Sequence, residues 1–94
     1  TEVDGVAVRV VVSESLDQSV IVASDLADPA DDEVYQAWYQ RPGEGMVAAG
    51  QIAAHDTTVL AGPVRGAEAI GITVEPAAGS PEPTSDPVAL VPLT

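Results

Sequence analysis

Stretches of alternating apolar and polar residues recur along this chain, and turn-forming residues separate them. Within residues 6–12, Val8 and Val10 fall on one face of an extended strand while Arg9 falls on the other, which is typical of a half-buried strand. The chain as a whole predicts about seven short strands at intervals of roughly 10 residues, namely 6–12, 20–23, 34–40, 46–52, 57–61, 67–75 and 88–91. This pattern predicts an all-β fold, a small β-sandwich or barrel-like domain.

Residues 28–41 support two local structures. Asp28 is a good helix N-cap, Pro29 suits the first helical position, and Arg41 lies where a positive charge favours a helix C-terminus. Against this, residues 34–40 contain every aromatic side chain of the protein and suit a strand equally well. The local pattern therefore leaves a helix and a strand as equal alternatives.

The negative charge of the chain excludes nucleic acids as partners. Fifteen acidic residues face three arginines, with no lysine, so the formal net charge is −12. Such a surface repels nucleic-acid phosphates and anionic lipid headgroups. The charge is best explained by solubility, and attraction of a basic partner is the alternative.

Catalytic and metal-binding chemistry finds little support in the sequence. There is no cysteine for a disulfide, a thiolate nucleophile or a thiolate zinc site. His55 is the sole histidine and stands beside Asp56 in a predicted turn, while Asp31 and its acidic neighbours lack the residue spacing of a calcium loop. We expect a protein that is not an enzyme and that binds no cofactor or metal.

Two segments carry a family resemblance. The first contains Tyr35, Gln36 and Trp38. The second runs over residues 73–84 and contributes Thr73, Glu75, Pro76, Gly79, Ser80, Pro81, Pro83 and Thr84. Together these motifs resemble the C-terminal domain of the anti-sigma-K factor family, with Ala78 in a place where that family is expected to have glycine. The resemblance extends from about Val6 to the end of the chain.

The resemblance implies a role in transcription regulation and signal transduction. Members of such a family hold a sigma factor inactive through a cytoplasmic domain, which a single membrane-spanning helix connects to an extracytoplasmic domain. Regulated proteolysis, first outside the membrane and then within it, releases the sigma factor. Residues 6–94 would be the extracytoplasmic β domain of a bacterial membrane protein, and residues 1–5 the remnant of a juxtamembrane stalk on which the first protease acts. The sigma factor and the membrane tether would then involve parts outside this chain.

The sequence itself contains no run of about 18 apolar residues that could span a membrane, and its polar, acidic start does not resemble a signal peptide. The resemblance also favours a strand over a helix at residues 35–40. An alternative function is that of a secreted or surface β-sandwich that binds a ligand or partner and has no connection with transcription.

Two residues of the motifs have predicted structural roles. Trp38 is expected to fill the core of a protein that lacks phenylalanine, with Tyr35 and Tyr39 on the opposite face of its strand. Glu75 is expected to accept hydrogen bonds from the turn around Gly79 and Ser80, or to pair with an arginine, because an unpaired buried carboxylate is costly. A signal-sensing role for Glu75 is the alternative. The proline-rich stretch 76–87 is predicted to be a rigid brace rather than a peptide ligand.

Overall fold

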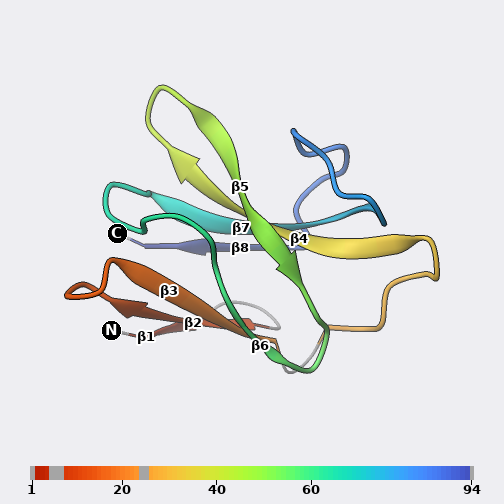
Figure 1. Ribbon diagram of the computed structural model, residues 1–94, viewed down its shortest axis with the longest axis horizontal. Coiled ribbons are helices and arrows are strands. Elements are labelled where there is room, and N and C mark those ends of the chain that lie inside the picture. The colour runs from red at the N-terminus through yellow and green to blue at the C-terminus, as the bar shows by residue number, and fades with distance from the viewer. Residues whose placement is uncertain (1, 5–7, 24–25, 94) are drawn as a thin grey trace.

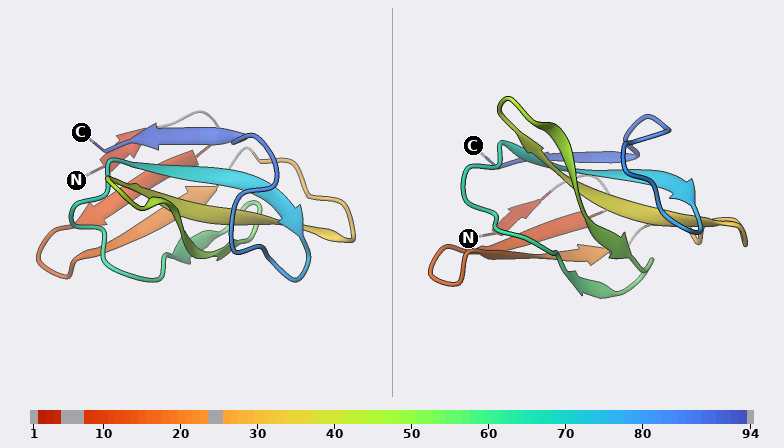
Figure 2. Two further views of the ribbon diagram at one scale, coloured as in Figure 1. Left: turned by 90° about the horizontal axis from the view of Figure 1, so that it is seen from above. Right: turned by 45° about the horizontal axis from the view of Figure 1, so that its top comes forward.

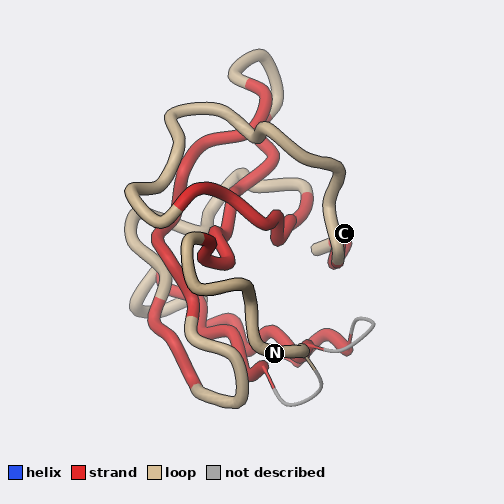
Figure 3. The backbone as a smooth tube through the Cα atoms, turned by 90° about the vertical axis from the view of Figure 1, so that its right-hand side faces the viewer, coloured by secondary structure: helices blue, strands red, loops and turns tan. Residues whose placement is uncertain are grey.

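The protein folds into two four-stranded antiparallel sheets packed face to face (Figure 1). The computed structural model describes residues 2–4, 8–23 and 26–93. In spatial order, the first sheet contains β1 (Glu2–Asp4), β2 (Val8–Ser13), β3 (Gln18–Ala23) and β6 (Thr57–Val59), and the second contains β5 (Gly45–Ile52), β4 (Glu33–Arg41), β7 (Ala69–Pro76) and β8 (Ala89–Pro92). None of the described residues is helical (Figure 3), so the predicted all-β sandwich is confirmed.

The helix that Asp28 and Pro29 could start does not form. Residues 26–30 have no regular secondary structure, residues 31–32 form a turn, and β4 runs from Glu33 to Arg41 between β5 and β7. A central strand gains hydrogen bonds on both edges and buries side chains on both faces. These tertiary gains outweigh a local capping preference of about 1 kcal/mol.

Valine, isoleucine and tyrosine side chains fill the space between the sheets. Val10 and Ile21 from the first sheet and Ile70, Ile72 and Val91 from the second are completely buried. These residues are β-branched and alternate with residues that face outward, which explains why the segments form strands rather than helices. The connections β3–β4, β5–β6 and β6–β7 all cross between the sheets, as expected for a sandwich with Greek-key connections (Figure 2).

One buried hydrogen bond connects the two sheets through this core. The hydroxyl of Tyr39 in β4 lies 2.5 Å from the hydroxyl of Ser19 in β3, and both side chains are almost fully buried. Burial raises the pKa of Tyr39 despite this hydrogen bond, so its hydroxyl stays protonated. Tyr35 also points inward, but its hydroxyl donates to the Ala27 carbonyl at 2.6 Å, closer to the surface.

The N-terminal segment differs from its expected form. Within residues 1–5, predicted as the remnant of a stalk, Glu2–Asp4 forms strand β1, with Glu2 opposite Val11 and Asp4 opposite Arg9, while Thr1 lies outside the described residues. The strand predicted at residues 6–12 is described only from Val8 onward, since residues 5–7 lie outside the described residues. The short, polar β1 lacks an alternation long enough to detect, so only its pairing with the valine-rich β2 reveals it.

We predict that Tyr39→Phe lowers the free energy of unfolding by about 1–3 kcal/mol, because it leaves the Ser19 hydroxyl buried without its partner. Urea unfolding would measure the change. Tyr35→Phe is the matched control and should cost less, since its hydroxyl bonds near the surface. Adding Ser19→Ala to Tyr39→Phe should recover part of the loss, whereas equal costs for the two tyrosine variants would contradict the assigned role.

Candidate functional site

The two family motifs meet on the outer face of the second sheet. β4 and β7 are neighbours, and their register places Gln36 opposite Thr73 and Trp38 opposite Gly71. Strand alternation directs these positions, together with Glu75, away from the first sheet. The segment between β7 and β8 returns over this face on the outer side of the sandwich (Figures 1 and 2). Side chains that are far apart in sequence therefore form one cluster. We call it the outer cluster, and it contains Gln36, Trp38, Thr73, Glu75, Ser80 and Thr84.

Trp38 is completely buried, as predicted, but it lies on the outer face of the second sheet rather than between the sheets. Its exposed fraction is 0%, yet it lies on the outer face, while Tyr35 and Tyr39 take the inner one. Its indole N–H donates to the Thr73 hydroxyl at 2.8 Å. Its cross-strand neighbour Gly71 has no side chain, and a Cβ there would come within 2.8 Å of the Met46 methyl group. Trp38 is thus fully buried on the outer face of the second sheet, apart from the core between the sheets.

Glu75 is the charged member of the outer cluster and is only 1% exposed. One carboxylate oxygen accepts a hydrogen bond from the Thr73 hydroxyl, and the other accepts one from the Thr84 hydroxyl. The Thr84 backbone N–H donates to both oxygens at 3.1 Å. Among the described residues no arginine is paired with it, so hydroxyl and amide dipoles compensate the charge.

These hydrogen bonds decide the charge state of Glu75. Burial alone would raise the pKa of the carboxyl, but donors from Thr73, Thr84 and Ser80 outweigh burial and lower the pKa below its ordinary value. The carboxylate is therefore ionised at neutral pH. A chain of hydrogen bonds runs from Trp38 through Thr73 to Glu75 and from there to Thr84, so it connects the sheet to the loop.

The same loop is held at two further points. The Gln36 side-chain amide donates to the Ser80 carbonyl at 2.9 Å and accepts from the Ser80 N–H at 3.0 Å. Ser85 donates to the Val74 carbonyl at 2.8 Å. Gly79 precedes this anchor with a φ of +80°, a conformation that favours glycine, and its N–H closes a turn onto the Pro76 carbonyl.

The structure thus brings together most of the residues that the motifs singled out. The outer cluster contains Gln36, Trp38, Thr73, Glu75, Ser80 and Thr84, and Pro76, Gly79, Pro81 and Pro83 lie on the path of the loop that covers it. Tyr35 belongs to the inner face instead. Ser85 was missed, because nothing in the sequence distinguishes an anchoring serine from a solvated one.

The outer cluster holds a loop in place and offers no arrangement for covalent chemistry. Its carboxylate is enclosed by donors, and the neighbouring Thr73 and Thr84 hydroxyls are engaged in hydrogen bonds to it. His55 lies elsewhere, with its imidazole 3.7 Å from the Asp28 carboxylate and both side chains exposed. Within residues 2–4, 8–23 and 26–93, no three histidine, cysteine or acidic side chains gather where they could hold a metal ion. The same part of the chain contains no helix long and apolar enough to cross a membrane.

Comparison with known proteins gives a consistent result. A family model described as the C-terminal part of the anti-sigma-K factor RskA matches residues 2–88. A protein of Streptomyces griseus, called "Uncharacterized protein in phr 5'region", is 51% identical over 85 residues, which cover 87% of this chain and 35% of that protein. "Anti-sigma-K factor RskA" of Mycobacterium sp. strain KMS is 35% identical over 94 residues, which cover 96% of this chain and 38% of that protein.

The chain therefore spans little more than a third of the length of these relatives. No solved structure matches it.

We predict that Glu75→Gln lowers the free energy of unfolding by about 1–3 kcal/mol at neutral pH, because hydrogen bonds to a buried carboxylate are replaced by weaker ones. The contribution of the wild-type carboxylate is fully present above the pKa of an unfolded glutamate. It is lost as the pH falls through the lowered pKa of the folded state. Thermal melts between neutral and acidic pH should therefore show a smaller pH dependence in Glu75→Gln. The exposed Glu82→Gln is the control, and pH profiles of wild type and Glu75→Gln that run parallel would contradict the prediction.

The single tryptophan is connected to the loop through Thr73 and Glu75. We predict that wild-type Trp38 fluoresces at the short wavelengths of a buried indole and resists quenching by acrylamide. Thr84→Val should increase quenching while the far-ultraviolet circular dichroism spectrum stays β-type, because it removes one attachment of the loop to Glu75. Thr57→Val, at an exposed position, is the control. Unchanged quenching in Thr84→Val would show that the loop does not depend on this bond.

Proposed function

The chain belongs to the C-terminal domain family of anti-sigma-K factors, and from this premise we propose that it is the extracytoplasmic regulatory domain of a membrane-tethered anti-sigma factor. In this proposal an upstream helix outside this chain tethers the protein to the bacterial membrane. A further part, also outside this chain, binds the sigma factor. The greater length of the relatives supports this division of roles.

The proposed mechanism is control of proteolysis by folding. A protease acting outside the membrane would cut the stalk that leads into the domain, which would start the release of the sigma factor. Proteases cleave chain segments that are transiently open rather than segments held in a sheet. The domain would therefore act as a brake whose strength depends on how often its N-terminal strand opens.

The pairing of β1 with β2 is the observation that carries this proposal. Glu2–Asp4 is hydrogen-bonded along β2, and β2 is held on its other side by β3. Val8 and Val10 fix β2 in the core, with exposed fractions of 5% and 0%. A chain entering through β1 is thus protected as long as β2 stays packed, and loosening β2 would lengthen the segment that a protease can reach.

We predict that Val10→Ala in the full-length protein raises both first-site cleavage and sigma-dependent transcription. Removing a buried aliphatic side chain costs about 2 kcal/mol, which corresponds to roughly a 30-fold larger open population if opening limits cleavage. Replacing Val8 and Val10 by polar residues should have a stronger effect in the same direction. Arg9→Ala, an exposed position on the same strand, is the matched control.

The readouts are the amount of cleaved anti-sigma factor on immunoblots and a sigma-dependent reporter gene. If purified Val10→Ala is destabilised while cleavage and transcription stay basal, the folding brake is wrong. The domain would then be a binding module whose ligand, and not its stability, carries any signal.

A further inference from the structure

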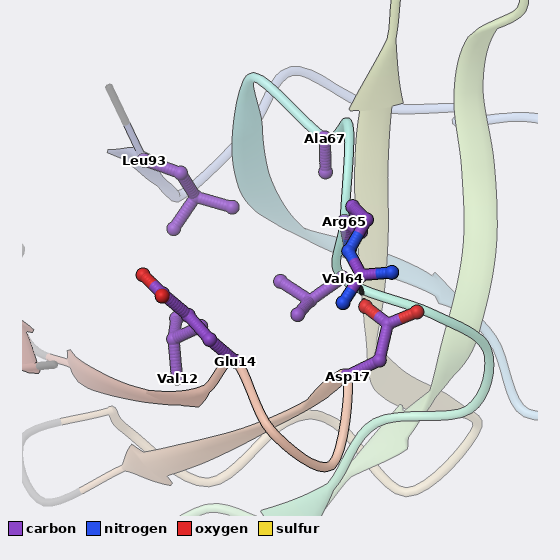
Figure 4. Close-up of a pocket in the computed structure, with 7 residues that line it drawn as sticks. All are labelled: Val12, Glu14, Asp17, Val64, Arg65, Ala67 and Leu93. Carbon is purple, nitrogen blue, oxygen red and sulfur yellow. Dashed lines mark hydrogen bonds between the residues drawn. The ribbon is translucent and has the colours of Figure 1, made fainter.

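A pocket of about 300 Å³ opens between the two sheets at one end of the sandwich (Figure 4). Its walls are apolar: Val12 comes from β2, Val64 and Ala67 from the segment before β7, and Leu93 follows β8. The side chains of Val64 and Leu93 both line the pocket and point toward the same space (Figure 4). The turn between β2 and β3, which supplies part of the lining, lies at the opposite end of the sandwich from the loop between β7 and β8 (Figure 1).

Charged residues surround the mouth of the pocket and fix its shape. Glu14, Asp17 and Arg65 complete its lining. The Asp17 carboxylate accepts a hydrogen bond from the Arg65 backbone N–H at 2.7 Å, and its carbonyl accepts one from the Val64 N–H at 3.4 Å. The turn between β2 and β3 is therefore connected to the opposite wall, and the pocket is formed before anything enters it.

Strand register places the pocket on the path of the incoming chain. β1 is antiparallel to β2, with Glu2 opposite Val11, so a chain that leads into Glu2 approaches from the side of Val12 and the turn that follows it. Val12 is itself a wall of the pocket. Successive residues of a strand are about 3.3 Å apart, so a few upstream residues are enough to reach the mouth.

We propose that this pocket holds the stalk, the polypeptide that precedes Thr1 in the longer protein, and thereby protects it from the first protease. This inference rests on the proposed function, since it requires a stalk upstream of the domain. An apolar side chain would enter between Val64 and Leu93. The two carboxylates at the mouth outnumber the one guanidinium, so flanking residues of the stalk would be basic or neutral rather than acidic.

Photo-cross-linking of the full-length protein in its membrane tests the docking directly. In two variants a benzophenone amino acid replaces either Glu14 or Arg65, which are exposed residues at the mouth of the pocket. In a third variant, the control, it replaces Ala53 in the exposed turn between β5 and β6. Mass spectrometry then identifies the captured peptide. We expect cross-links from positions 14 and 65, but not from position 53, to residues upstream of Thr1 in the same molecule. Capture of a second copy, another protein or lipid, or no capture at all, would overturn the proposal.

A variant in which a larger side chain fills the pocket provides a second test of the docking. Ala67→Leu places a larger side chain in the cavity, whereas Ala53→Leu makes the same change at an exposed site. We expect Ala67→Leu to abolish the stalk cross-link and to raise first-site cleavage about tenfold, with Ala53→Leu unchanged. If Val10→Ala raises cleavage while the stalk cross-link is absent, the folding brake stands and the docking is wrong. A stalk cross-link together with unchanged cleavage in Val10→Ala would instead support docking and contradict the brake.

Discussion

The antiparallel pairing of β4 with β7 is the interaction on which the rest of this domain depends, because both faces of the pair are buried. On the inner face it carries Tyr39, Ile70 and Ile72 into the space between the sheets. On the outer face it carries Trp38, which donates to Thr73, and Glu75, which accepts from Thr84 in the loop that follows β7. Neither the main core nor the outer cluster could form if this register slipped by one residue, since every side chain would change face.

The buried carboxylate explains why a charged residue is tolerated in such a small protein. A domain of about 94 residues has little apolar surface to bury, and an unpaired charge would remove much of its stability. Glu75 avoids this cost by accepting hydrogen bonds from Thr73 and Thr84, so its charge holds the loop to the sheet. The Thr73 hydroxyl that donates to Glu75 also accepts the indole N–H of the only tryptophan.

Much of the fold could be predicted from the sequence, because alternation in short valine- and isoleucine-rich segments specifies strands. The strands at β2, β4 and β7 follow from it within a few residues. Alternation separates the two faces of a strand but does not say which face points toward the other sheet. For that reason Trp38 was predicted to lie between the sheets, whereas it lies on the outer face. Glu75 was correctly expected to accept a hydrogen bond from the turn at Ser80, but its partner Thr84 was not identified. Thr84 lies nine residues away along a proline-rich loop whose path depends on three-dimensional packing. β1 is too short and polar to be recognised without its partner strand.

The strands differ in length and in their position within the sheets, and this difference supports the proposed function. β4 and β7 are buried on both faces, whereas β1 is a three-residue strand at the edge of the first sheet. Short edge strands open at a lower free energy than central ones. In the proposed control of proteolysis, a strand that opens easily must lie where the stalk meets the domain. The rest of the domain must stay folded so that this strand can pair again.

Amide hydrogen exchange of the full-length protein, measured alongside its first-site cleavage, tests this account most directly. The account predicts that amides of the β1–β2 ladder exchange through a local opening at lower free energy than those of the β4–β7 ladder. It also predicts that cleavage accelerates in proportion to that opening when mild urea is added. Exchange of both ladders only through global unfolding, or cleavage that does not respond to the β1–β2 opening, would contradict it.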